Sequence, residues 1–265
     1  MAITTLQGVI DGILPSRPIG KFSQNSASPI PPRAAFVKYN SVPIGGLIST
    51  ATNGAVFTNA SQGALPFNNP PTGQNTYLAG MKWPHITEVR NIFLVDFLWS
   101  KQINSRIITP QTINSVQFPD RDRNGSSNGD GVYIALYSYT SNGLIVAAAI
   151  SYTNSAGTSG RSGNMLWDNV TGQSGIFMPF SLASGDLGVR SVQSVTLSAP
   201  ASGASLALIA FRPIASISSF QTKTLELTDD AVSFGLPRIY DGSCLTFIYH
   251  SGSATLYGSV QFTQG

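Results

Sequence analysis

Many short apolar or alternating segments, each ended by residues that favour turns, make up most of the sequence. Gly, Asn, Ser, Asp and Pro separate these segments from one another. Segments of this length and spacing predict antiparallel strands in a β-sandwich or barrel. The expected strands are residues 91–99, 106–108, 115–118, 132–139, 144–153, 175–180, 191–197, 205–211, 231–234, 244–249 and 254–262.

Composition supports the same fold class. The 26 Gly and 16 Pro residues penalise long helices, and a hydrophobic fraction of 42% is enough for a packed core. Asn142-Gly143, between residues 132–139 and 144–153, predicts a hairpin that pairs those two strands antiparallel. We therefore expect an all-β chain: a two-sheet jelly roll of about eight strands, or a related antiparallel β-sandwich.

The first 33 residues form a predicted N-terminal arm. Thr5 can cap a short helix whose apolar positions follow helical spacing and which ends before Pro15. These positions, Leu6, Val9, Ile10 and Ile13, are the candidate assembly-interface residues. The Pro-rich residues 15–32 predict an extended segment that is either a strap along its own domain or an arm that reaches a neighbouring subunit.

Residues 34–265 are predicted to form a single β-sandwich domain. Within it, turn residues dominate positions 34–84, which predicts a loop-rich excursion, and residues 85–265 form the strand-rich part.

Charged residues make up only 10% of the chain, against about 25% in typical soluble domains. The densest basic stretch, Arg121 to Arg123, alternates with Asp120 and Asp122, so we expect no nucleic-acid partner. The apolar segment 144–150 is too short to cross a membrane, and the N-terminus does not resemble a secretory signal. Cys244, alone in an apolar segment, predicts a buried small hydrophobic residue.

Catalytic chemistry has few candidates in this sequence. His85 and His250 are the two histidines, and we expect the first to make a loop contact and the second to end a strand. Neither a nucleophile-elbow motif nor zinc-ligand spacing occurs, so no catalytic residue, cofactor or metal site is predicted.

Two weaker signals point to a ligand. Asp120 to Asn124 resembles the opening of a calcium loop, but Gly131 stands where the closing Glu belongs, which favours a solvated turn. Trp83, Trp99 and Trp167 could stack on sugars, although Trp99 ends an apolar strand and is expected in the core.

Several strings of the sequence resemble structural proteins of tailed bacteriophages. They are Phe67-Asn-Asn-Pro-Pro-Thr-Gly-Gln-Asn-Thr-Tyr-Leu-Ala, Phe97-Leu-Trp and residues 122–132, 151–161 and 177–194. The resemblance covers most of the chain and consists of turn and strand signatures. It therefore implies a shared fold and a virion role, and it transfers no catalytic residue.

The resemblance implies a capsid decoration or cement protein on the outer head surface. Such a protein is made in the cytoplasm of the host bacterium, binds the major capsid protein or other virion proteins, and is often a homotrimer. A surface rich in neutral polar groups loses little solvation energy when it is covered, which also favours an assembly component. The alternatives are a tail, baseplate or head-fibre component that contacts a host glycan, and a jelly-roll enzyme that acts on polysaccharide.

Overall fold

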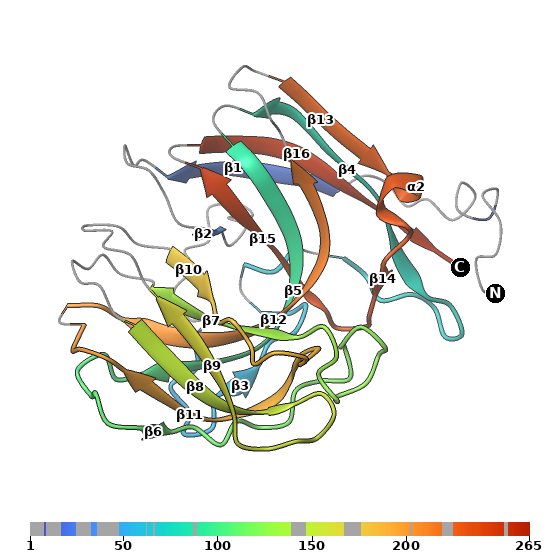
Figure 1. Ribbon diagram of the computed structural model, residues 1–265. Helices are drawn as coiled ribbons and strands as arrows, with labels where there is room; N and C mark the ends of the chain where they lie inside the picture. Colours follow the sequence, from blue (N-terminus) through green and yellow to red (C-terminus); the bar gives the residue numbers. More distant parts are fainter. Residues whose placement is uncertain are drawn as a thin grey trace.

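The computed structural model describes residues 8, 17–24, 33–35, 48–61, 63–65, 67–86, 89–138, 147–166, 176–201, 203–218, 225–251 and 254–265. Strands in these residues form three sheets (Figure 1), and all their pairings are antiparallel. The prediction of an all-β antiparallel sandwich is confirmed. The strands are distributed over three sheets rather than the two of a jelly roll.

The central sheet closes on itself. Its strands follow the order β12, β7, β10, β2, β15, β5, and β12 pairs again with β5. We call these six strands the ring. Strand β3 pairs with the C-terminal part of β5, at Trp99 and Ser100. Closure leaves few open edges in this sheet. Its strands are β2 (Arg33–Ala35), β3 (Ala55–Val56), β5 (Val89–Ile103), β7 (Tyr133–Ser138), β10 (Ile176–Pro179), β12 (Leu206–Ser218) and β15 (Cys244–Ser251).

Two further sheets pack on the outside of the ring, at the top and bottom of Figure 1. The terminal sheet contains β1 (Arg17–Gln24), β16 (Ala254–Gln264), β4 (Thr76–Ile86), β13 (Leu225–Asp230) and β14 (Arg238–Ile239). The medial sheet contains β6 (Gln111–Thr112), β11 (Val189–Leu197), β8 (Ala147–Asn154) and β9 (Arg161–Leu166).

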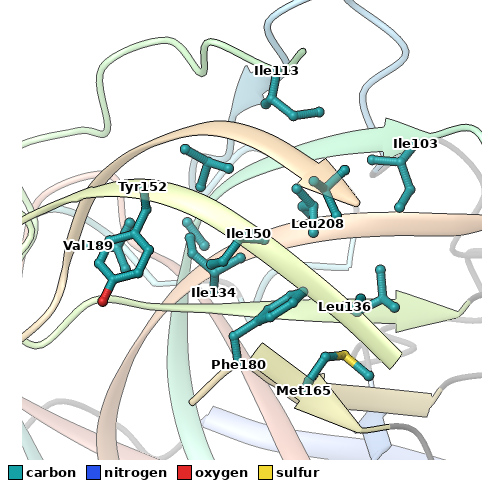
Figure 2. Packing of buried hydrophobic residues seen from close by; sticks show 14 of the residues in the cluster. Ile103, Ile113, Ile134, Leu136, Ile150, Tyr152, Met165, Phe180, Val189 and Leu208 are labelled. Carbon is teal, nitrogen blue, oxygen red and sulfur yellow. The ribbon is translucent and has the colours of Figure 1, made fainter. Parts of the chain in front are cut away.

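The burial pattern of each strand follows from its place in these layers. Along β7, Ile134 and Leu136 point into the core under the medial sheet, while Ala135 and Tyr137 point into the ring interior. Both faces are buried, so the strand is apolar from Ile134 to Leu136 and ends on the buried Ser138. In β8 every second residue is buried, because only one face of the medial sheet is covered. Figure 2 shows Ile150 and Tyr152 of β8 together with Ile134, Leu136 and Leu208 from the ring.

Three predictions about local structure are wrong. Residues 106–108 and 115–118 are loops, and residues 231–234 form the short helix α2 (Ala231–Phe234). Asp230 accepts hydrogen bonds from the backbone N–H groups of Val232 and Ser233, and Gly235 ends the helix with φ 67°. Capping at both ends therefore decides the conformation of this apolar segment.

The predicted hairpin at Asn142-Gly143 lies outside the described residues, and its two strands do not pair with each other. Strand β7 pairs with β10 and β12 in the ring, whereas β8 pairs with β9 and β11 in the medial sheet. The chain therefore passes from one layer to another between these strands. Turn signals describe local backbone preference and contain no information about which sheet receives the next strand.

The segment predicted to be loop-rich, residues 34–84, includes most of strand β4, and His85 lies in that strand rather than in a loop. The Pro-rich segment includes β1, which pairs with β16 of the same chain from Arg17 opposite Val260 to Gln24 opposite Ala254. Residues 17–24 therefore form an edge strand of the terminal sheet.

Candidate functional site

The candidate assembly-interface residues Leu6, Val9, Ile10 and Ile13 lie outside the described residues. Trp167 also lies outside them. Trp99 is fully buried in β5, and its Nε1 atom donates to the backbone oxygen of Asn53 at 2.9 Å. It is a core residue, as predicted, and it offers no surface for a sugar.

A loop between Phe118 and β7 contains the residues that resemble a calcium site. The buried carboxylate of Asp122 accepts five hydrogen bonds at 2.7–3.1 Å: four from backbone N–H groups of residues 124, 126, 129 and 130, and one from the Ser126 hydroxyl. Burial raises the pKa of Asp122, but the bonds from Ser126, Asn124 and Asp130 outweigh burial and leave this pKa below its ordinary value.

These donors make Asp122 the centre around which the loop folds. A cation would have to replace N–H and O–H donors that already point at both carboxylate oxygens. Asp120 is exposed, and the described residues contain no group of three or more His, Cys, Asp or Glu side chains that could hold a metal ion. The arrangement is that of a loop stabilised by one carboxylate.

A buried ionic cluster lies where the loop crosses the ring. Asp96 of β5 is opposite Arg212 of β12 in the strand register, and Arg121 from the loop places its Nε atom 3.6 Å from Asp96 Oδ2. All three side chains are buried. They lie between the core under the medial sheet, which contains Leu98, and the core under the terminal sheet, which contains Leu94. We call them the ionic cluster.

Hydrogen bonds connect the ionic cluster to two other segments and to the neighbouring backbone of β5. Asp96 accepts from the Ser243 hydroxyl and the Cys244 backbone N–H, both at 2.8 Å. Arg121 donates to the backbone oxygens of Phe57, Phe97 and Gly242. The cluster therefore joins residues 57, 96–97, 121 and 242–244, which are far apart in the sequence. Buried polar groups joined in this way fix one arrangement of the surrounding backbone.

Burial is the main influence on the pKa values of Asp96 and Arg212. It raises the pKa of Asp96, and the charges of Arg121 and Arg212 and the two hydrogen bonds oppose that rise. Burial also lowers the pKa of Arg212. The guanidinium groups of Arg212 and Arg238 lie 5.1 Å and 4.8 Å from the centre of the Tyr240 ring, which gives both cations a favourable contact.

Cys244 is buried beside Asp96, and burial raises the pKa of its thiol to about 12. A thiol with this pKa remains protonated at neutral pH and is a poor nucleophile. The prediction that Cys244 is a buried small hydrophobic residue is confirmed.

A third carboxylate, that of Asp186, attaches the loop before β11 to the medial sheet. It accepts from the Tyr152 hydroxyl, the Asn154 side-chain amide at 2.7 Å and Arg161 Nε at 2.9 Å. The hydrogen bond from Arg161, followed by that from Tyr152, lowers the pKa of Asp186 to about 2. The side chain of Asp186 is 4% exposed, and both of its carboxylate oxygens accept hydrogen bonds from these partners.

The low pKa of Asp186 predicts an acid-dependent loss of stability. Its ordinary pKa is 3.8 and its folded value is about 2, so the stabilising contribution is complete above pH 3.8 and is lost as the pH falls toward 2. We expect Asp186→Asn to lower the melting temperature at pH 7, and the gap to the wild type to shrink between pH 4 and pH 2. Thermal unfolding followed by circular dichroism at several pH values measures this gap. A gap that stays constant over this range would show that the Asp186 charge is not responsible.

Two hollows lie at the medial-sheet end of the molecule. One has a volume of about 710 Å³ and is lined mainly by small and apolar residues of β8 and β11, among them Ala147, Ala149 and Leu197. The other, of about 530 Å³, lies beside the end of β5 and contains one ionisable residue, Lys101. Neither hollow contains a carboxylate or a histidine, so general acid–base catalysis has no candidate pair in them.

Sequence reasoning missed the ionic cluster and the role of Asp186. Asp96 in the apolar segment 91–99 is a signal that could have predicted the ionic cluster, because a buried charge requires a partner. Its partners Arg121 and Arg212 lie 25 and 116 positions away in the sequence, and no local pattern relates them.

Comparison with known proteins gives no family for this chain. No family profile and no curated protein sequence matches it. Within the described residues, no helix is long and apolar enough to span a membrane.

Similar solved structures come from infectious bursal disease virus. The structure of its Gx strain is 10% identical, covers 99% of this chain and 85% of that chain, and has a TM-score of 0.20. The VP2 subviral particle is 13% identical; the match covers 76% of this chain and 46% of that chain, with a TM-score of 0.17. The chain of the derived T=1 particles is 12% identical; the match covers 96% of this chain and 79% of that chain, with a TM-score of 0.18. Superpositions this loose establish neither a common fold nor a common function.

Proposed function

We propose that the protein is a structural component of a bacteriophage particle, a capsid decoration protein that binds the outer head surface and stabilises the shell. One observation carries this proposal: the buried carboxylates of the described residues, Asp96 and Asp122, hold loops on the β framework, as does Asp186. The groups that an enzyme would use for chemistry instead make a rigid platform. Rigid platforms suit proteins that cover and reinforce a surface.

The sequence resemblance to tailed-phage structural proteins supports the same role. The low charge content supports it too, since a surface of neutral polar groups is covered at a small cost in desolvation. The proposed partners are the major capsid protein or other virion proteins, and the proposed assembly is a homotrimer, in which heterologous contacts around a three-fold axis would bury part of that surface.

Rebinding to heads tests the proposal. Heads are purified from a phage in which the gene for this chain is deleted, and the purified protein is added back. We expect saturable binding to these heads and a higher temperature of DNA release, measured by dye fluorescence, after saturation. The matched control is bovine serum albumin at the same concentration.

The alternatives give different results in this experiment. A tail, baseplate or fibre protein would bind tails and leave the heads bare. A polysaccharide-active enzyme would release sugar from the host surface and lose that activity when a single carboxylate is replaced. Either result would contradict the decoration role.

A further inference from the structure

Two isoleucines are exposed next to each other on the loop between β5 and β6. Ile107 and Ile108 have exposed fractions of 40% and 49%. Large apolar side chains that face water side by side are a common feature of sites that bind another protein. We call residues 104–110 the apolar loop.

The apolar loop is braced from both ends. The side-chain amide of Gln111 accepts from the backbone N–H of Asn104 at 2.9 Å and donates to the backbone oxygens of Asn104 and Ile107 at 2.9 Å and 3.2 Å. The Asn104 side chain accepts from the Arg106 backbone N–H at 3.0 Å. The loop is therefore ordered before any partner arrives, which lowers the entropy lost on binding.

Neighbouring segments support the loop and define its surroundings. The Ser105 backbone oxygen accepts from the Ala201 N–H at 2.7 Å, and the Gln102 N–H donates to Ser49 at 2.7 Å. The described residues of segments 48–57, 98–118 and 198–208 thus lie together at one end of the molecule, which includes the hollow beside β5. These three segments contain Lys101 and Arg106 but no Asp or Glu.

The charge of this end indicates the chemistry of its partner. The exposed Arg106 lies directly before the two isoleucines, and Lys101 lies in the adjacent hollow. An apolar contact bordered by cations and free of anions is complementary to a protein surface that offers an apolar hollow beside carboxylates. We propose that the apolar loop attaches the protein to such a surface on the virus head. This inference rests on the proposed function and adds the face that makes the contact.

A pair of substitutions tests the inference. We expect the double variant Ile107→Asp, Ile108→Asp to bind heads at least about tenfold more weakly, with only a small change in melting temperature because both side chains are already about half exposed. Val232→Asp is the matched control: Val232 is 75% exposed on α2, beside the terminal sheet at the other end of the molecule (Figure 1). We expect Val232→Asp to bind as the wild type does. The probe is the purified head made without the chain, and bound protein is quantified after sedimentation.

Two further variants separate the contributions of shape and charge. Gln111→Ala removes the brace and is expected to weaken binding while the isoleucines remain. Arg106→Ala is expected to reduce the dependence of binding on salt concentration, because a cation that faces carboxylates is screened by salt.

The outcomes distinguish this inference from the proposed function. If the wild type does not bind heads, the proposed function fails, and this inference fails with it. If the wild type binds and the double aspartate variant binds equally well, the apolar loop is not the contact and the decoration role stands. Equal loss of binding in Val232→Asp and the double variant would also overturn the inference, because the effect would not be specific to this face.

Discussion

Replacing Arg121 with methionine is expected to lower the free energy of unfolding by about 3–5 kcal/mol, the range observed when one member of a buried ion pair is removed. Arg121 donates to the backbone oxygens of Phe57, Phe97 and Gly242 and lies beside the carboxylate of Asp96. Methionine fills part of the space but donates no hydrogen bond. It therefore removes one donor from each of three carbonyl groups and takes the neighbouring cation away from the buried Asp96 carboxylate, which keeps its hydrogen bonds from Ser243 and Cys244.

Two variants make this test specific. Arg123→Met, two positions along the same loop, changes an exposed side chain and is expected to change stability by less than about 0.5 kcal/mol. Adding Asp96→Asn to Arg121→Met removes the buried negative charge that Arg121 would have faced, so the double variant should lose less stability than the sum of the two single variants. Urea unfolding is measured for the wild type, the three single variants Arg121→Met, Arg123→Met and Asp96→Asn, and the double variant. If Arg121→Met were as stable as the wild type, the ionic cluster would not hold these segments together.

Replacing Gly129 with alanine is expected to destabilise the protein by about 2–5 kcal/mol, the sum of a left-handed backbone and a steric overlap. Gly129 has φ 84°, and a Cβ atom there would lie 2.0 Å from the backbone oxygen of Val189. The oxygen belongs to the main chain, so it cannot turn aside as a flexible side chain could. Gly129 is in the loop around Asp122, and Val189 begins β11. Neither segment can move without breaking its own hydrogen bonds, which include the bond from the Gly129 N–H to Asp122.

Gly160→Ala is the matched control for this substitution. Gly160 has φ 71°, but a Cβ atom there has no neighbour within 4 Å. Gly160→Ala is therefore expected to be destabilised only by the left-handed backbone conformation of the new alanine, by about 1–2 kcal/mol. The difference between the two variants isolates the close approach of the loop to β11. Equal destabilisation in urea unfolding would contradict the close packing of these two segments.

The sequence allowed prediction of most long strands, because their residues are either mostly apolar or alternate between apolar and polar. Residues 91–99, 132–139, 191–197, 205–211 and 244–249 correspond to β5, β7, β11, β12 and β15. Short apolar segments were mistaken for strands where polar side chains decide the conformation. Gln111 and Asn104 shape the apolar loop, and Asp230 and Gly235 shape α2. Propensity is a weak guide over so few residues.

The sheet topology could not be predicted from local patterns. The Asn142-Gly143 signal suggested that β7 pairs with β8, whereas β7 joins the ring and β8 the medial sheet. The candidate site shows the same limit: Asp122 resembled a metal ligand, yet its partners are N–H and O–H donors. Which donors surround a carboxylate depends on the path of the backbone, and residue spacing alone does not determine that path.

Copy number and position in the intact particle test the central claim most directly. A cryo-electron microscopy map of purified virions, together with quantitative mass spectrometry, measures both. The account predicts on the order of hundreds of copies on the outer surface of the head, arranged by the symmetry of the shell. A few to dozens of copies at the tail, or absence of the protein from the particle, would contradict it.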